Sequence, residues 1–73
     1  MIDAELIESR FRLTPRQSQV LAHRLNDQTI EYVAAMMSLP EGSICNYLNR
    51  LIAWFKVRTE AELLHLVKQR CLS

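Results

Sequence analysis

Residues 29–55, TIEYVAAMMSLPEGSICNYLNRLIAWF, contain the pattern that decides the fold of this 73-residue chain. Thr29 is a suitable N-cap, because its hydroxyl can accept a hydrogen bond from a free backbone N–H in the first turn of a helix. Apolar residues then recur at helical spacing, at Ile30, Val33, Ala34 and Met37. Pro40 disfavours helical geometry at Leu39, so the helix over 29–37 is predicted to end near Met37.

A longer helix is predicted to begin at Pro40 or Glu41 and to continue to residue 55. Its apolar stripe consists of Ile44, Leu48, Leu51, Ile52 and Phe55. Two helices joined by a turn of about three or four residues form a helix-turn-helix unit, which places its second helix in the major groove of DNA. We expect the core of such a unit to contain Val33, Ile44, Leu48 and Leu51.

The flanking sequence adds further helices. Thr14-Pro15-Arg16-Gln17 combines a capping box with proline at the first helical position and predicts a helix over 15–25. Thr59-Glu60-Ala61-Glu62 repeats the capping box and predicts a last helix over 60–71. The chain has one Gly and two Pro, so few positions favour tight turns. An all-α domain of four main helices is expected.

The N-terminal residues can form a short extra helix over 3–11, with Asp3 as its cap. The predicted organisation is an N-terminal extension or linker over 1–12 and one domain over 13–73. A chain of this length has room for one small core only. Met1 is followed by acidic residues instead of the basic and apolar stretches of a signal peptide, and no apolar run can span a bilayer. We therefore expect a cytoplasmic protein.

The charge balance is nearly neutral. Nine Lys and Arg oppose eight Asp and Glu, which gives a net charge of +1 and a pI of about 7.8. Domains that bind nucleic acid often have a pI above about 9, so binding here would require local segregation of positive charge.

The helix over 41–55 is expected to present a polar outer face. Side chains turn by about 100° per residue, so the face opposite the apolar stripe holds Gly42, Asn46, Asn49 and Ala53, flanked by Cys45 and Arg50. Asparagine can pair with adenine through two hydrogen bonds, and arginine can contact guanine or phosphate. The alternative is a solvated face that binds nothing, because Asn and Arg are mostly exposed in any protein.

A family resemblance favours the first interpretation. The residues that carry it are Leu13-Thr14-Pro15-Arg16, Val20-Leu21, Val33-Ala34, Ile44, Asn46, Leu48 and Val57-Arg58-Thr59-Glu60-Ala61-Glu62-Leu63. Their order and spacing resemble the LuxR-type (GerE) helix-turn-helix family of bacterial transcriptional regulators, without insertion or deletion over about residues 13–66. The resemblance implies sequence-specific binding of double-stranded DNA through the third helix of four.

The resemblance also implies roles for particular residues. The third helix, over 41–55, would contact DNA through Ser43, Cys45, Asn46, Tyr47, Asn49 and Arg50. We expect Asn46 and Asn49 to read bases and Ser43, Tyr47 and Arg50 to hold the DNA backbone. The fourth helix, over 60–71, would form a homodimer contact through Leu63, Leu64, Val67 and Lys68, because Leu66 and Leu72 add to an apolar surface larger than one short helix needs. The alternative is that Leu63, Leu66 and Val67 pack on the first helix and the other apolar residues form no contact. Regulation would come from a sensory domain or another regulator.

Several residues depart from the family pattern. Asp27 replaces the usual Gly after the first helix, and Ile30-Glu31 replaces the frequent Asn-Lys. Pro40, Cys45 and Tyr47 stand where the family usually has Ser, Lys and His. These substitutions remove positive charge near the expected phosphates. They favour an alternative function, in which a degenerate helix-turn-helix module binds another regulator protein instead of DNA.

The remaining chemistry-bearing residues predict no enzyme, cofactor or metal site. His23 and His65 lack ligands at metal spacing, and Cys45 and Cys71 match no zinc or disulfide pattern, so both cysteines are expected to be reduced thiols. Trp54 is expected to pack at the domain edge, with a partly exposed position facing a partner as the alternative. Met36 and Met37 are expected to fill gaps in the core, with a partner groove as the alternative.

Overall fold

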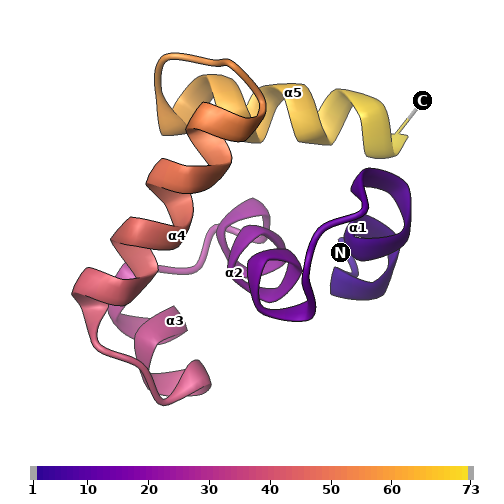
Figure 1. The fold of residues 1–73 in the computed structure, drawn as a ribbon. Coiled ribbons are helices and arrows are strands. Elements are labelled where there is room, and N and C mark those ends of the chain that lie inside the picture. Colours follow the sequence, from indigo (N-terminus) through magenta and orange to yellow (C-terminus); the bar gives the residue numbers. More distant parts are fainter. Residues whose placement is uncertain (1, 73) are drawn as a thin grey trace.

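The computed structural model describes residues 2–72, and the side chains of residues 2–71. Five helices follow one another along the chain (Figure 1). They are α1 (Ala4–Phe11), α2 (Pro15–Leu25), α3 (Ile30–Met37), α4 (Glu41–Trp54) and α5 (Glu60–Leu72). No strand occurs in this part of the chain. The all-α fold with a helix-turn-helix unit, formed by α3, a three-residue turn and α4, is therefore confirmed.

Side-chain caps begin α2 and α3 as the sequence predicts. The Thr14 hydroxyl accepts a hydrogen bond from the Gln17 N–H, and the Gln17 side chain accepts one from the Thr14 N–H, which completes the capping box. Thr29 accepts from the Tyr32 N–H at 3.1 Å. Pro40 precedes α4 without any side-chain cap. The helix that presents the expected DNA face therefore begins without this local stabilisation.

The start of α5 differs in one detail from the predicted capping box. The Thr59 hydroxyl accepts a hydrogen bond from the Glu62 N–H at 3.1 Å, as expected. The Glu62 carboxylate accepts from the Arg58 N–H at 2.9 Å rather than from the N–H of Thr59. Glu62 therefore fixes the chain one residue before the cap.

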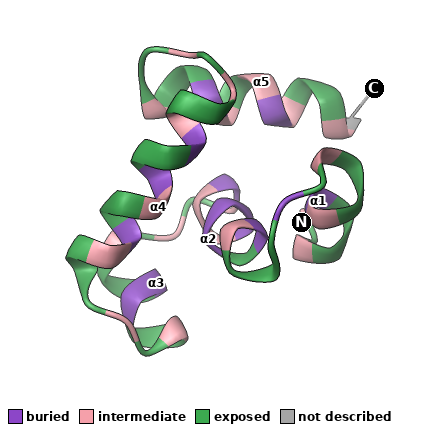
Figure 2. Cartoon of the chain, in the orientation of Figure 1, coloured by how far each residue is buried: buried purple, intermediate pink, exposed green. Residues whose placement is uncertain are grey.

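The core has two clusters of buried residues, and both include residues of α2 and α4 (Figure 2). The larger cluster joins α1, α2, α4 and α5 through Ile7, Leu13, Leu21, Ala22, Leu25, Leu51, Leu63 and Val67. The smaller cluster joins α2, α3 and α4 through Val20, Val33, Ala34, Ile44 and Leu48. The four core residues predicted for the helix-turn-helix unit are all buried.

α1 is part of the folded body. Ile7 is fully buried, and the Phe11 ring meets the Phe55 ring edge to face at a centroid distance of 5.2 Å. The Asn26 side chain donates to the carbonyl of Ile2 and accepts from its N–H, both at 3.1 Å. Described residues of the segment before residue 13 therefore pack against the rest of the domain.

A salt bridge ties α2 to the start of α5. The Arg24 guanidinium donates from Nε to the Glu60 carboxylate at 2.7 Å and from Nη2 at 2.9 Å, and Nη1 donates to the carbonyl of Gln28 at 2.6 Å. These hydrogen bonds to Glu60 raise the pKa of Arg24 above its ordinary value, although partial burial acts in the opposite direction. Arg24 therefore has a structural role, because it holds α2 to the start of α5.

Two expectations about packing are wrong. Trp54 is 67% exposed and Met36 is 58% exposed, so neither side chain is in the core, whereas Met37 packs against the smaller cluster. Trp54 is the last residue of α4 and lies one turn after the exposed Arg50, on the same side of the helix. Met36 shares its side of α3 with the exposed Tyr32, opposite the buried Val33 and Ala34.

The first four helices are each followed by a residue in the left-handed backbone region. These residues are Arg12, Asp27, Ser38 and Lys56, with φ between 55° and 64°. None of them is glycine, the residue that adopts this conformation most readily. Asp27, with φ 64°, therefore lies at a position whose backbone favours glycine.

Candidate nucleic-acid interface

α4 presents one long face to solvent. Ile44, Leu48 and Leu51 are buried. The helical turn then leaves the opposite side free, where Gly42, Cys45, Asn46, Asn49, Arg50 and Ala53 are all exposed. This is the outward face predicted from the sequence, and the green side of α4 in Figure 2 follows it.

Four polar side chains on one flank of this face line a shallow pocket of about 190 Å³. They are Ser43, Asn46, Tyr47 and Arg50, spaced at i, i+3, i+4 and i+7. Tyr47 packs against the smaller core cluster, which supports one wall of the pocket. Two hydroxyls, an amide and a guanidinium provide hydrogen-bond donors for an anion, and the guanidinium supplies the positive charge. The structure thus brings together four residues that the sequence predicted for DNA contact.

The two other predicted contact residues lie on the opposite flank of the exposed face. Asn49 and Cys45 are four positions apart and share one side of α4, beyond Asn46. Both are exposed, and the Cys45 thiol is free. Asn49 does not line the pocket. Its amide could therefore contact a second group while an anion occupies the pocket.

Charge is unevenly distributed along the helix-turn-helix unit. No Lys or Arg occurs between Arg24 and Arg50, whereas this stretch contains Asp27, Glu31 and Glu41. Arg50, Lys56 and Arg58 then follow without an intervening acid. The local positive charge that DNA binding requires is therefore found at the C-terminal end of α4. The net charge of the whole chain does not reveal this positive region, because nearly equal numbers of basic and acidic residues cancel.

α5 buries two of the four residues predicted for the dimer contact. Leu63 and Val67 are fully buried in the larger core cluster, because this i, i+4 pair faces the cluster that includes Ile7 and Leu21. They are not available on the surface of the monomer. Leu64 and Lys68 are partly exposed, as is Leu66. Leu64 and Leu66 are therefore the leucines of α5 that retain some exposed surface, and the Leu72 side chain lies outside the described part.

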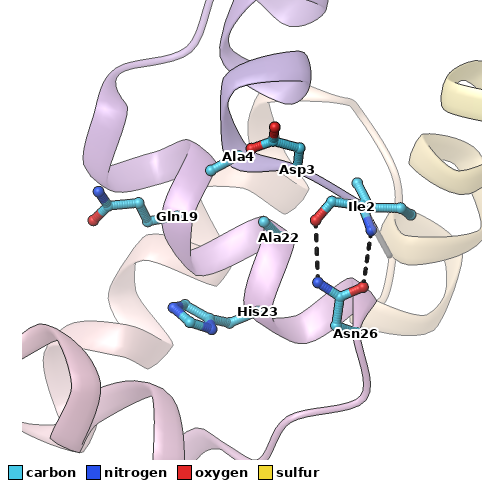
Figure 3. Close-up of a pocket in the computed structure, with 7 residues that line it drawn as sticks. All are labelled: Ile2, Asp3, Ala4, Gln19, Ala22, His23 and Asn26. Carbon is cyan, nitrogen blue, oxygen red and sulfur yellow. Dashed lines mark hydrogen bonds between the residues drawn. The ribbon is translucent and has the colours of Figure 1, made fainter.

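A second pocket, of about 400 Å³, separates the start of α1 from α2 (Figure 3). It is lined by Ile2, Asp3, Ala4, Gln19, Ala22, His23 and Asn26. Figure 3 shows the Asn26 amide facing the Ile2 backbone, while Gln19 and His23 project from the same helix. This pocket was not predicted from the sequence, because it depends on how α1 docks against α2.

Comparisons with protein-family models, with curated proteins and with solved structures find no match for this chain. Within residues 2–72, no group of three His, Cys, Asp or Glu side chains is placed to hold a metal ion. Nor does any helix in that range have the length and apolar character needed to cross a membrane. The functional inference therefore rests on the helix-turn-helix geometry and on the α4 face.

Proposed function

We propose that this protein is a DNA-binding domain of the LuxR type, which recognises a specific double-stranded sequence through α4 and acts as the output module of a bacterial transcriptional regulator in the cytoplasm. The observation that carries the proposal is the pocket of Ser43, Asn46, Tyr47 and Arg50 beside the exposed Asn49. A helix-turn-helix unit presents this side of its second helix to the major groove.

The two flanks of the face suit different parts of a duplex. The Arg50 guanidinium and the hydroxyls of Ser43 and Tyr47 are donors suited to phosphate oxygens, and such contacts fix the position of the protein. Asn49, on the other flank, can make two hydrogen bonds to one adenine. Asn46 lies between them and is assigned to the bases, whereas Cys45 provides a small, close contact with the groove.

Selection from a pool of duplexes with a randomised segment, followed by salt titration of the enriched sequence, tests the proposal. We expect one sequence to be enriched and its affinity to fall as salt is raised, because binding to phosphates releases counterions. Asn49→Ala should lower the discrimination between the selected site and an altered site by about 1–3 kcal/mol. Gln69→Ala, an exposed change on α5, is the matched control. Failure to enrich any sequence at low salt would contradict the proposal.

We also propose that α5 forms a two-fold homodimer contact through Leu64 and Lys68. Such a dimer would set the spacing of two half-sites on the DNA. Sedimentation of the wild-type chain and of a Leu64→Glu, Lys68→Glu variant tests this. We expect the wild type to dimerise at high micromolar concentration and the variant to remain monomeric. A monomeric wild type would remove the contact from the proposal.

A second candidate function is binding to another regulator protein. The absence of Lys and Arg between Arg24 and Arg50 favours it, because this stretch would lie near phosphates in a DNA complex. Binding to a random-sequence duplex separates the two functions: a DNA-binding domain shows affinity that depends steeply on salt, whereas a protein-binding module shows little binding at any salt.

A further inference from the structure

The outer face of α3 is unusually apolar for an exposed surface. Its exposed residues are Glu31, Tyr32, Ala35 and Met36, of which only Glu31 is charged. Tyr32 is 44% exposed and Met36 is 58% exposed. The edge-to-face contact with the His23 ring, at a centroid distance of 6.1 Å, holds one side of the Tyr32 ring. Exposed apolar patches on small domains commonly mark interaction sites.

The charged residues of α3 and of the segments directly before and after it are all acidic. Between Arg24 and Arg50 the sequence contains only Asp27, Glu31 and Glu41 as charged residues. Asp27 precedes α3, Glu31 lies in its first turn, and Glu41 begins α4 after the three-residue turn. A partner for this face should therefore combine an apolar or aromatic group with positive charge.

The far end of α4 has that combination. Trp54 is the most exposed large hydrophobic residue described, and Arg50 lies one turn before it on the same side of the helix. Lys56 and Arg58 follow within four residues, and no acidic residue occurs between Arg50 and Glu60. α4 has 14 residues, so its two ends are about 20 Å apart, and α3 packs beside its N-terminal part (Figure 1).

We propose that the α3 face of one copy of this chain binds the Trp54 end of a second copy, in a head-to-tail contact. The Trp54 indole would cover Tyr32 and Met36, while Arg50, Lys56 and Arg58 would lie opposite Asp27, Glu31 and Glu41. Trp, Tyr and Arg are the residue types that contribute most to protein interfaces. The contact joins two different surfaces, so it leaves one of each free and allows further copies to add.

This inference goes beyond DNA recognition and does not depend on it. The test is sedimentation equilibrium without DNA, in a Leu64→Glu background that removes the α5 contact. We expect the average mass to rise with concentration at about 20 mM salt and to return to that of the monomer at about 500 mM, because salt screens exposed charge pairs. Trp54→Glu and Met36→Glu should each weaken the association at least about tenfold.

Two charge reversals provide a complementation test. Glu31→Lys changes only the α3 face, and Lys56→Glu changes only the Trp54 end. Each variant alone should remain monomeric at low salt. An equal mixture should associate, because the unaltered α3 face of one variant can bind the unaltered Trp54 end of the other. Glu5→Lys and Gln69→Glu, at exposed positions on α1 and α5, are the matched controls and should associate like the parent chain.

All substituted residues except Leu64 are exposed. Leu64 is partly buried against the larger core cluster, so circular dichroism verifies the fold of the Leu64→Glu parent as well as that of each variant. A chain that is monomeric at low salt overturns the proposal, and so does association that is unaffected by Trp54→Glu or Met36→Glu. A mixture of the two charge reversals that associates no better than each variant alone also overturns it. Because DNA is absent from the assay, none of these results bears on whether α4 reads a duplex.

Discussion

Arg50 is the one basic residue within α4, and it lines the pocket with Ser43, Asn46 and Tyr47. Arg50→Gln removes the charge but keeps a hydrogen-bonding side chain of similar length. We expect it to weaken binding to all duplexes together and to reduce the salt dependence of the affinity by about one counterion. Fluorescence anisotropy over a series of salt concentrations measures both quantities. Arg12→Gln, at the end of α1, removes one charge elsewhere and should leave the slope unchanged; equal effects of the two changes would indicate a general charge effect.

Residue-level predictions of exposure succeeded on α4, but they failed for Trp54 and Met36, which are exposed, and for Leu63 and Val67, which are buried. The 14 residues of α4 include a well-spaced apolar stripe, so the opposite face could be predicted from helical geometry alone. Trp54 and Met36 were expected to be buried because of their chemistry. Their burial depends instead on whether another helix covers that side, and no local pattern encodes this.

At the scale of the element, α4 is held by its buried stripe. Leu48 is 5% exposed and packs with Val20, Val33 and Ile44 where α2, α3 and α4 meet. Leu48→Ala should lower the free energy of unfolding by about 2–5 kcal/mol, through lost burial and a cavity. Urea denaturation followed by circular dichroism measures the change. Asn49→Ala, the next residue on the exposed side, should alter stability by less than about 0.5 kcal/mol. Equal stability of the two variants would place Leu48 outside the core.

The helices themselves were largely predictable, because their starts carry local signals. Thr14 and Thr29 cap α2 and α3 through hydrogen bonds within four residues, so neighbouring sequence suffices to place them. The Glu62 carboxylate accepts a hydrogen bond from the Arg58 N–H and not from the Thr59 N–H, although these two donors are neighbours in the chain. Such a choice depends on the path of the chain into α5, which sequence spacing does not specify.

For the whole molecule, the main test concerns α1. Deletion of residues 1–11 would expose the pocket that Ile7 fills and remove the ring that packs on Phe55. We expect the shortened chain to lose cooperative unfolding or to melt at a much lower temperature, because a domain of this size has a small stability margin. Calorimetry of both chains decides this. An undiminished melting temperature would restore the interpretation of these residues as a linker.

The arrangement of the whole molecule was the least predictable level. Residues 3–11 could be assigned to a helix from their own sequence, but not to the core. Ile7, Leu63 and Val67 belong to one core cluster, which joins parts of the chain that are far apart in sequence. The same long-range contacts buried half of the expected dimer surface and created the pocket beside Asn26.

The backbone conformation of the residues that follow the first four helices determines where the thermal stability of this protein can be raised. Arg12, Asp27, Ser38 and Lys56 hold a left-handed conformation in which a Cβ atom approaches the following carbonyl oxygen. Glycine lacks that atom, yet the chain places its single glycine within α4 instead. The connections between helices are thus held by tertiary packing against local preference. Thermal tolerance can therefore increase, in evolution or by engineering, through these connections alone, while the core and the α4 face stay as they are.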